Sequence, residues 1–197
     1  MLVGSNNSLT YLEPSSPWFK VFKYIWRCQT IDFKRQYTNG GVRLFDIKLS
    51  VDSYNHIIVK NGIFSYSVFS LYDVFDFLNK QGDVIVHISF NVNGDECCDN
   101  RYYSMERKFM EYCKIIETIY DDIRFYGGER LFDGKVIYTF EKETLNPKPL
   151  VFNVANYSFA YRIASIISPR LTRKMNKKYK EKYWKLHGFL LLNHVGD

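Results

Sequence analysis

Short β-type runs alternate with helical stretches along the whole chain, and this alternation constrains the fold more than any other feature. The apolar runs have the length and the branched residues of buried strands, and the stretches between them carry apolar residues at helical spacing. This order favours an α/β fold with parallel strands. Strands are predicted at residues 1–3, 42–49, 57–59, 84–90, 136–140, 151–154 and 189–195, and helices at 70–80, 106–120 and about 171–184.

About seven strands separated by helices fit a small TIM-type (β/α) barrel, here in a single domain over residues 1–197, although such barrels typically have ~250 residues. Two of the helices are predicted from apolar residues that fall on one face. Gly127-Gly128 and Asp133-Gly134 are predicted to be turns. The apolar faces comprise Leu71, Val74, Phe75 and Leu78 in the first helix, and Phe109, Tyr112, Cys113, Ile116 and Ile119 in the second.

The composition excludes a disordered chain, because 18% aromatic residues with a net charge of +6 can form a core. No apolar run approaches the ~18–20 residues that span a bilayer, and no secretory signal is visible. The four cysteines (Cys28, Cys97, Cys98 and Cys113) have neither disulfide-framework nor zinc-ligand spacing, which favours reduced thiols. We therefore expect a cytoplasmic protein, with peripheral membrane binding left open; a mature secreted chain whose signal peptide has been removed is the alternative.

Basic charge is concentrated in the segment Arg170–Lys185, which holds eight Lys and Arg residues against one acid, Glu181, and leaves the rest of the chain close to neutral. A basic helix flanked by aromatic residues can lie on an anionic membrane surface. The solvated outer face of a barrel helix has the same composition. The solvated face is the interpretation that we favour, because such faces are common and need no partner. The segment carries no nucleic-acid-binding motif, so among partners an anionic membrane or another anionic surface is the better alternative.

Four segments carry patterns more specific than periodicity. They are Gly-Ser-Asn-Asn-Ser at 4–8; Cys-Gln-Thr at 28–30 with Gln36 and Gly-Val-Arg-Leu-Phe-Asp-Ile-Lys at 41–48; Ile-Ile-Val-Lys-Asn-Gly at 57–62; and Gly-Phe-Leu-Leu-Leu-Asn at 188–193. In this order they resemble phosphatidylinositol-specific phospholipase C and its relatives, and the second segment is the strongest match. Residues from about 95 to 185 match only loosely. The resemblance implies a (β/α) barrel with its active site at the carboxyl ends of the strands.

The same resemblance implies that two histidines would transfer protons during cleavage of a phosphodiester. Asn6 and Asn61 occupy the positions of the general base and the general acid. Asn7 and Asn193 occupy the positions of two carboxylates. An amide has no usable pKa, so asparagine can hold a hydrogen bond but cannot shuttle a proton. The family mechanism should therefore not operate in this chain.

The charge on the second strand favours the metal-free branch of the family. Asp46 is followed by Lys48, and a lysine is a poor neighbour for calcium, which prefers oxygen ligands. Metal-independent relatives place an arginine at the position of Lys48, which can supply a positive charge to a phosphate. Ser89 shares the parity of His87 on the 84–90 strand, so both are candidates to face the barrel interior. No metal and no cofactor is expected.

Two main functions follow. The first is a non-catalytic protein that binds a phosphoinositide, another phosphodiester or polyol ligand, or a protein partner. The second is an active phosphoric diester hydrolase, either with a site reworked around His87 or the acidic residues Asp95, Glu96 and Asp99, or as an inactivated form of an active parent. A structural or surface role is expected for each single histidine, because relocated catalysis needs two in register.

Overall fold

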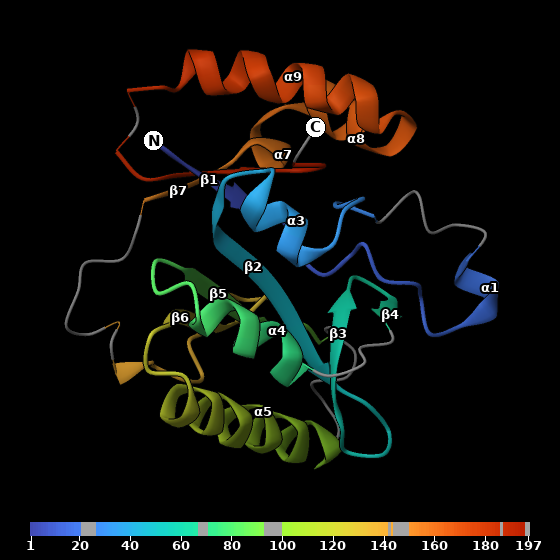
Figure 1. Ribbon diagram of the computed structural model, residues 1–197. Helices are drawn as coiled ribbons and strands as arrows, with labels where there is room; N and C mark the ends of the chain where they lie inside the picture. Colours follow the sequence, from blue (N-terminus) through green and yellow to red (C-terminus); the bar gives the residue numbers. More distant parts are fainter. Residues whose placement is uncertain are drawn as a thin grey trace. The chain divides into compact units, whose positions relative to one another are not determined.

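The computed structural model describes residues 1–20, 27–66, 71–92, 100–141, 143, 150–185 and 187–195 (Figure 1). The chain forms two compact units, and their boundary falls inside one long strand. Unit 1 comprises residues 1–46 and 149–197, and unit 2 comprises residues 47–148. None of the helices in the described part of the chain is both long and apolar enough to cross a membrane.

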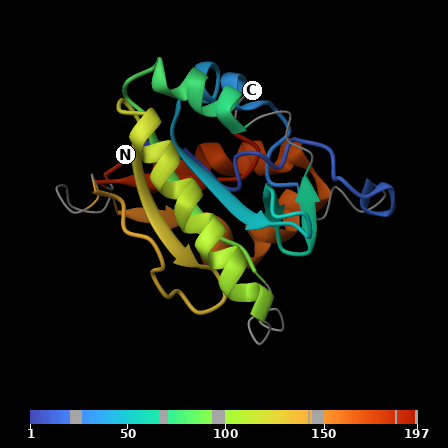
Figure 2. The same ribbon diagram turned by 90° about the horizontal axis from the view of Figure 1, so that it is seen from below.

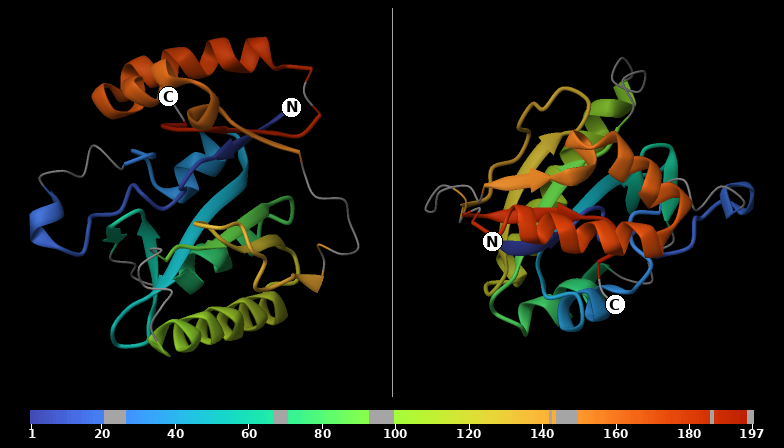
Figure 3. Two further views of the ribbon diagram at one scale, coloured as in Figure 1. Left: turned by 180° about the vertical axis from the view of Figure 1, so that it is seen from behind. Right: turned by 90° about the horizontal axis from the view of Figure 1, so that it is seen from above.

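Unit 1 is built on four neighbouring strands that run parallel (Figure 3). Their order is β7 (Val151–Asn153), β8 (Phe189–Leu192), β1 (Leu2–Ser5) and the first half of β2 (Val42–Val51). Gly4 leaves room for this packing, because a Cβ there would lie 2.6 Å from Leu191 Cδ2. The helices are α1 (Pro17–Lys20), α3 (Phe33–Thr38), α7 (Val154–Tyr157), α8 (Phe159–Ile167) and α9 (Pro169–Lys182).

A single serine separates the last two helices of unit 1. Ser168 is the C-cap of α8 and the N-cap of α9, where its Oγ accepts a hydrogen bond from Leu171 N at 3.3 Å. Pro169 occupies the first turn of α9, where a missing N–H costs nothing. The basic helix predicted at about 171–184 is therefore confirmed, with its start two residues earlier and its end two residues earlier than expected.

Unit 2 pairs the second half of β2 with strands on both sides. On one side β3 (Ile57–Asn61) and β4 (Phe64–Tyr66) run antiparallel, and on the other side follow β5 (Ile85–Phe90) and β6 (Arg124–Arg130), which are parallel to each other. The helices are α4 (Leu71–Asn79) and α5 (Asn100–Ile119), which Figure 2 shows from below. The chain is thus mixed α/β, and a complete TIM barrel is not shown, since β3 and β4 depart from the expected parallel order.

The predicted helix faces of unit 2 are largely confirmed. All four apolar residues expected on α4 are buried, and so are the first four expected on α5. Phe109 of α5 stacks on Phe90 of β5 with ring centroids 4.8 Å apart. Ile119 is predicted on the same face of α5, but it is 55% exposed because the helix ends there.

Two sequence predictions in unit 2 are wrong. Residues 136–140 do not form a strand, and only an isolated bridge joins Val136 to Glu129. Gly127-Gly128 is not a turn but lies inside β6, at the point where its register with β5 shifts. Both glycines have positive φ (104° and 78°), a backbone conformation that glycine adopts readily and that some strand bulges use. A Cβ on Gly127 would lie 2.4 Å from the carbonyl oxygen of Ile88, so only glycine fits.

Candidate functional site

Three asparagine side chains meet at the carboxyl ends of three neighbouring parallel strands in unit 1. Asn6 follows β1, Asn193 follows β8, and Asn153 ends β7. Asn6 Nδ2 donates to Asn193 Oδ1 at 2.8 Å, and Asn153 Nδ2 donates to Asn6 Oδ1 at 3.2 Å. Both ends of the Asn6 amide are therefore held, and the three side chains, called the asparagine cluster below, form a hydrogen-bonded chain.

Asn7 and Cys28 lie beside the asparagine cluster. Asn7 Nδ2 donates to Cys28 Sγ at 3.2 Å, and Asn6 Nδ2 lies 3.9 Å from the same sulfur. Asn7 has a φ of 47°, which asparagine tolerates better than most residues, and its backbone N–H donates to Asp46 Oδ2 at 3.0 Å. Asn7 Oδ1 is buried and has no hydrogen-bond partner among the described residues. The structure thus places Asn6, Asn7 and Asn193 close together, and the roles that the family resemblance gives them stay predictions.

A buried glutamine holds the backbone under the cluster. Gln29 Nε2 donates to the carbonyl oxygens of Asn6 at 3.0 Å and of Leu192 at 2.9 Å, and its Oε1 accepts from Val195 N at 3.1 Å. The ends of β1 and β8 are therefore joined through one side chain. Because these backbone groups have no access to water, each needs such a partner.

Tyr161 of α8 fixes the backbone of Asn193 from the other side. Its hydroxyl accepts from Asn193 N at 2.7 Å and donates to Asn176 Oδ1 at 2.7 Å. Burial raises the pKa of Tyr161, so the hydroxyl stays protonated and can serve both bonds. Asn193 is consequently positioned through its main chain as well as its side chain.

The remaining predicted site residues belong to unit 2. Lys48 is half-buried on β2, Asn61 is the last residue of β3, and Ser89 is buried on β5. The hydroxyl of Ser89 has no hydrogen-bond partner in the described ranges. The roles that the family resemblance assigns to these three residues stay predictions.

His87 is paired with a carboxylate that sequence reasoning missed. His87 Nε2 lies 2.6 Å from Glu129 Oε1, across the β5–β6 pair, and the ring packs on Tyr126 with centroids 4.7 Å apart. Glu129 follows the two glycines that were predicted to form a turn, so its place in a strand beside His87 was not foreseen. The acidic residues Asp95, Glu96 and Asp99, like Cys97 and Cys98, lie outside the described residues.

His194 has a structural role, as expected for a single histidine. It is 1% exposed, and its Nε2 donates to the carbonyl oxygen of Ser165 at 2.9 Å. Burial, assisted by the charges of Arg173 and Arg27 and opposed by the hydrogen bond to Ser165, lowers the pKa of His194 to about 4. The ring is therefore neutral at physiological pH.

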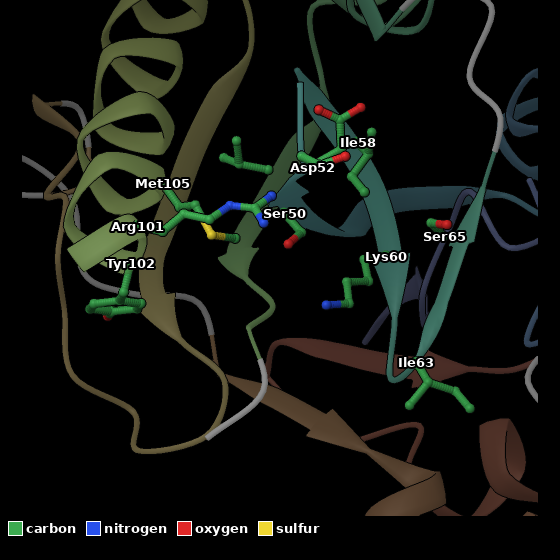
Figure 4. Close-up of a pocket in the computed structure, with 11 residues that line it drawn as sticks. Ser50, Asp52, Ile58, Lys60, Ile63, Ser65, Arg101, Tyr102 and Met105 are labelled. Atoms are coloured by element: carbon green, nitrogen blue, oxygen red, sulfur yellow. The ribbon is translucent and has the colours of Figure 1, made fainter. Parts of the chain in front are cut away.

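A cavity of about 510 Å³ in unit 2 lies between the β2–β3 hairpin, β4 and the first turns of α5 (Figure 4). Figure 4 shows Ser50, Lys60 and Arg101 directed toward its interior. Its lining includes none of the residues that the sequence proposed for the site. The lining residues are Ser50, Val51, Asp52, Ser53, Ile58, Lys60, Ile63, Ser65, Arg101, Tyr102 and Met105.

Asp52 is the acidic residue in this lining, and backbone groups of the turn between β2 and β3 donate hydrogen bonds to it. Its Oδ1 accepts from the backbone N–H groups of Tyr54 and His56, each at 2.8 Å. Burial alone would raise the pKa of Asp52, but these two hydrogen bonds and the neighbouring His56 ring outweigh it, so the pKa lies below its ordinary value. The lining therefore combines one carboxylate with the cationic side chains of Lys60 and Arg101 and with apolar residues.

Cys28 and Cys113 are not in disulfides. Over the ranges that the structure describes, no three His, Cys, Asp or Glu side chains are grouped so that they could hold a metal ion. No protein-family model matches the sequence. No curated protein matches it either.

Proposed function

We propose that this chain is a non-catalytic binding protein of the phosphatidylinositol-specific phospholipase C type, which holds a polyol or phosphorylated polyol at the asparagine cluster. The observation that supports the proposal is the hydrogen-bonded chain from Asn153 through Asn6 to Asn193. It occupies the carboxyl ends of parallel strands, where barrel proteins of this class bind their ligands. That the strands belong to a (β/α) barrel of this family is part of the same proposal.

The chemistry of the cluster suits binding better than bond cleavage. An amide presents two donors and an acceptor, which match the hydroxyl groups of a polyol. None of the three amides can take or release a proton near neutral pH, so general acid–base catalysis has no carrier among them. The buried, unpartnered Asn7 Oδ1 adds an acceptor that a ligand hydroxyl could satisfy.

Turnover of phosphatidylinositol and glycerophosphoinositol tests the proposal. We expect no turnover of either substrate by the unmodified chain, because the amides of the cluster cannot transfer protons. Binding of myo-inositol should shift the side-chain amide NMR signals of the cluster, and an Asn153→Ala variant should weaken it. Turnover by the unmodified chain would overturn the non-catalytic proposal.

One observation favours a second candidate, an active phosphoric diester hydrolase that uses His87. The 2.6 Å contact between His87 and Glu129 is the arrangement in which a carboxylate orients an imidazole as a general base. If this candidate is right, the unmodified chain is active and His87→Gln abolishes the activity. The matched control is His56→Gln, which removes an exposed imidazole beside Asp52 and should leave activity unchanged.

A further inference from the structure

Three cationic side chains lie on one face of α9. Arg173, Lys177 and Lys180 are spaced by four and three residues, so they are neighbours on the helix surface. Together with Asn39, which follows α3, and His194, which follows β8, they line a cavity of about 210 Å³ in unit 1. None of the asparagine cluster lines this cavity, so it is a separate place on the molecule.

The positive charge in this cavity is not balanced by acids. Within the described residues, Arg173, Lys177 and Lys180 form no ion pair with Asp or Glu. Lys180 is half-buried, and burial lowers its pKa. His194 is neutral at physiological pH and contributes no charge. The lining therefore carries three positive charges and no negative charge near neutral pH.

Such an arrangement destabilises the ligand-free protein. Like charges three and four residues apart on a helix repel each other, and a half-buried ammonium group loses part of its hydration. An anion in the cavity would relieve both effects. Lys174 and Lys178 of the same helix are exposed and do not line the cavity. Only part of the positive charge of α9 therefore lies at the cavity wall.

We propose that this cavity binds one phosphate group. The volume suits a single small anion with a few waters and is below the ~300–1,000 Å³ of pockets for larger organic ligands. Arginine can bind two phosphate oxygens in parallel, and lysine supplies a point charge. Lys177 is exposed, which leaves the mouth open to a free phosphomonoester or to the phosphate of a lipid headgroup.

Calorimetric titration with inorganic phosphate near neutral pH, at physiological salt, tests the site. We expect saturable binding that Lys180→Gln and Arg173→Gln each weaken at least about tenfold, since each removes a charge-assisted contact. Lys178→Gln is the matched control, because it removes the same charge from the same helix outside the cavity; it should change the affinity less than about twofold. Equal weakening by Lys178→Gln and Lys180→Gln, or no saturable binding, would overturn the proposal.

Vesicles distinguish the two sources of phosphate. If a lipid headgroup is the ligand, vesicles of phosphatidylcholine with phosphatidic acid bind the chain, inorganic phosphate competes, and Lys180→Gln releases the protein. If a free phosphomonoester is the ligand, glycerol 3-phosphate binds and the vesicles do not. Vesicle binding that phosphate does not compete with, and that Lys178→Gln weakens equally, indicates a diffuse basic surface and contradicts the cavity. Asn6→Ala should not alter phosphate binding, because Asn6 does not line the cavity. The phosphate proposal and the proposal for the asparagine cluster can therefore be refuted independently.

Discussion

Replacing Gln29 by glutamate should make the stability of the protein depend on pH. Gln29 is fully buried, and its amide nitrogen donates to two carbonyl oxygens, those of Asn6 and Leu192. A glutamate has nearly the same shape but cannot donate when ionised. The carboxylate would then face two carbonyl oxygens, while only Val195 N still donates to it. Its charged form is disfavoured by burial and by these neighbours, so its pKa should be raised in the folded state.

The size of the stability loss in Gln29→Glu follows from the hydrogen bonds that the buried side chain makes. With the introduced carboxyl group protonated, its O–H can donate to one of the two carbonyl groups, so the variant loses one bond, about 1 kcal/mol. The unfolded-state pKa is about 4.3, and the folded-state pKa should lie about 2 to 3 units higher. Between these values the folded protein binds the extra proton, so stability falls by about 1.4 kcal/mol for each unit of rising pH. Near neutral pH the total loss is about 4 to 5 kcal/mol.

Urea unfolding of the parent and the variant across the acidic and neutral range measures this difference. Gln29→Leu is the control, because it removes the same donor without adding a titratable group. The difference between its free energy of unfolding and that of the parent should therefore not change with pH. A Gln29→Glu deficit that is equally flat would refute the inference that the side chain is buried against the two carbonyl groups.

Three further predictions concern single residues. Gly127→Ala should lower the free energy of unfolding by at least about 2 kcal/mol in thermal unfolding, because the new Cβ would clash with the Ile88 carbonyl group. Gly134→Ala should lower it by only about 1 kcal/mol, because the space around Gly134 is open and only its φ of 71° is unfavourable for alanine. The His194 ring should titrate near pH 4 when followed by NMR, and a titration midpoint near 6.5 would contradict its burial. Because the unfolded chain binds this proton at a higher pH, the free energy of unfolding should fall by about 3 kcal/mol between about pH 6.5 and pH 4. Tyr161→Phe should cost about 1 to 3 kcal/mol in urea unfolding, because Asn193 N loses its acceptor; an unchanged midpoint would show that water replaces the hydroxyl.

Periodicity predicted the apolar strands β2 and β5, missed β6, which glycine interrupts, and predicted a strand at 136–140 that does not form. The runs at 42–49 and 84–90 are strands in the structure. β6 escaped prediction because Gly127-Gly128 has the composition of a turn, although a strand bulge needs the same backbone freedom. The predicted strand at 136–140 has β-branched and aromatic residues, but propensity alone does not provide a neighbouring strand to pair with.

The sequence named part of the asparagine cluster, and what the cluster does stays a prediction. The resemblance placed Asn6, Asn7 and Asn193, and the structure brings them together. Asn153 was missed, because its partner Asn6 lies 147 residues away and only the adjacency of three strands joins them. A signal was nevertheless present, since Asn153 ends one apolar run and Asn193 follows another, and parallel strands end at the same edge of a sheet. Glu129 carried no such signal.

The boundary between the two units also limits how this protein can be divided. It falls between Asp46 and Ile47, in the middle of β2, so a fragment ending there would keep only part of that strand. Residues 42–45 would lose their continuation, and residues 47–51 would remain as a short piece beside β3. Exposed strand edges of this kind favour aggregation. Neither unit is therefore a module that recombination or truncation could exchange alone, and any fusion or split design should leave β2 intact.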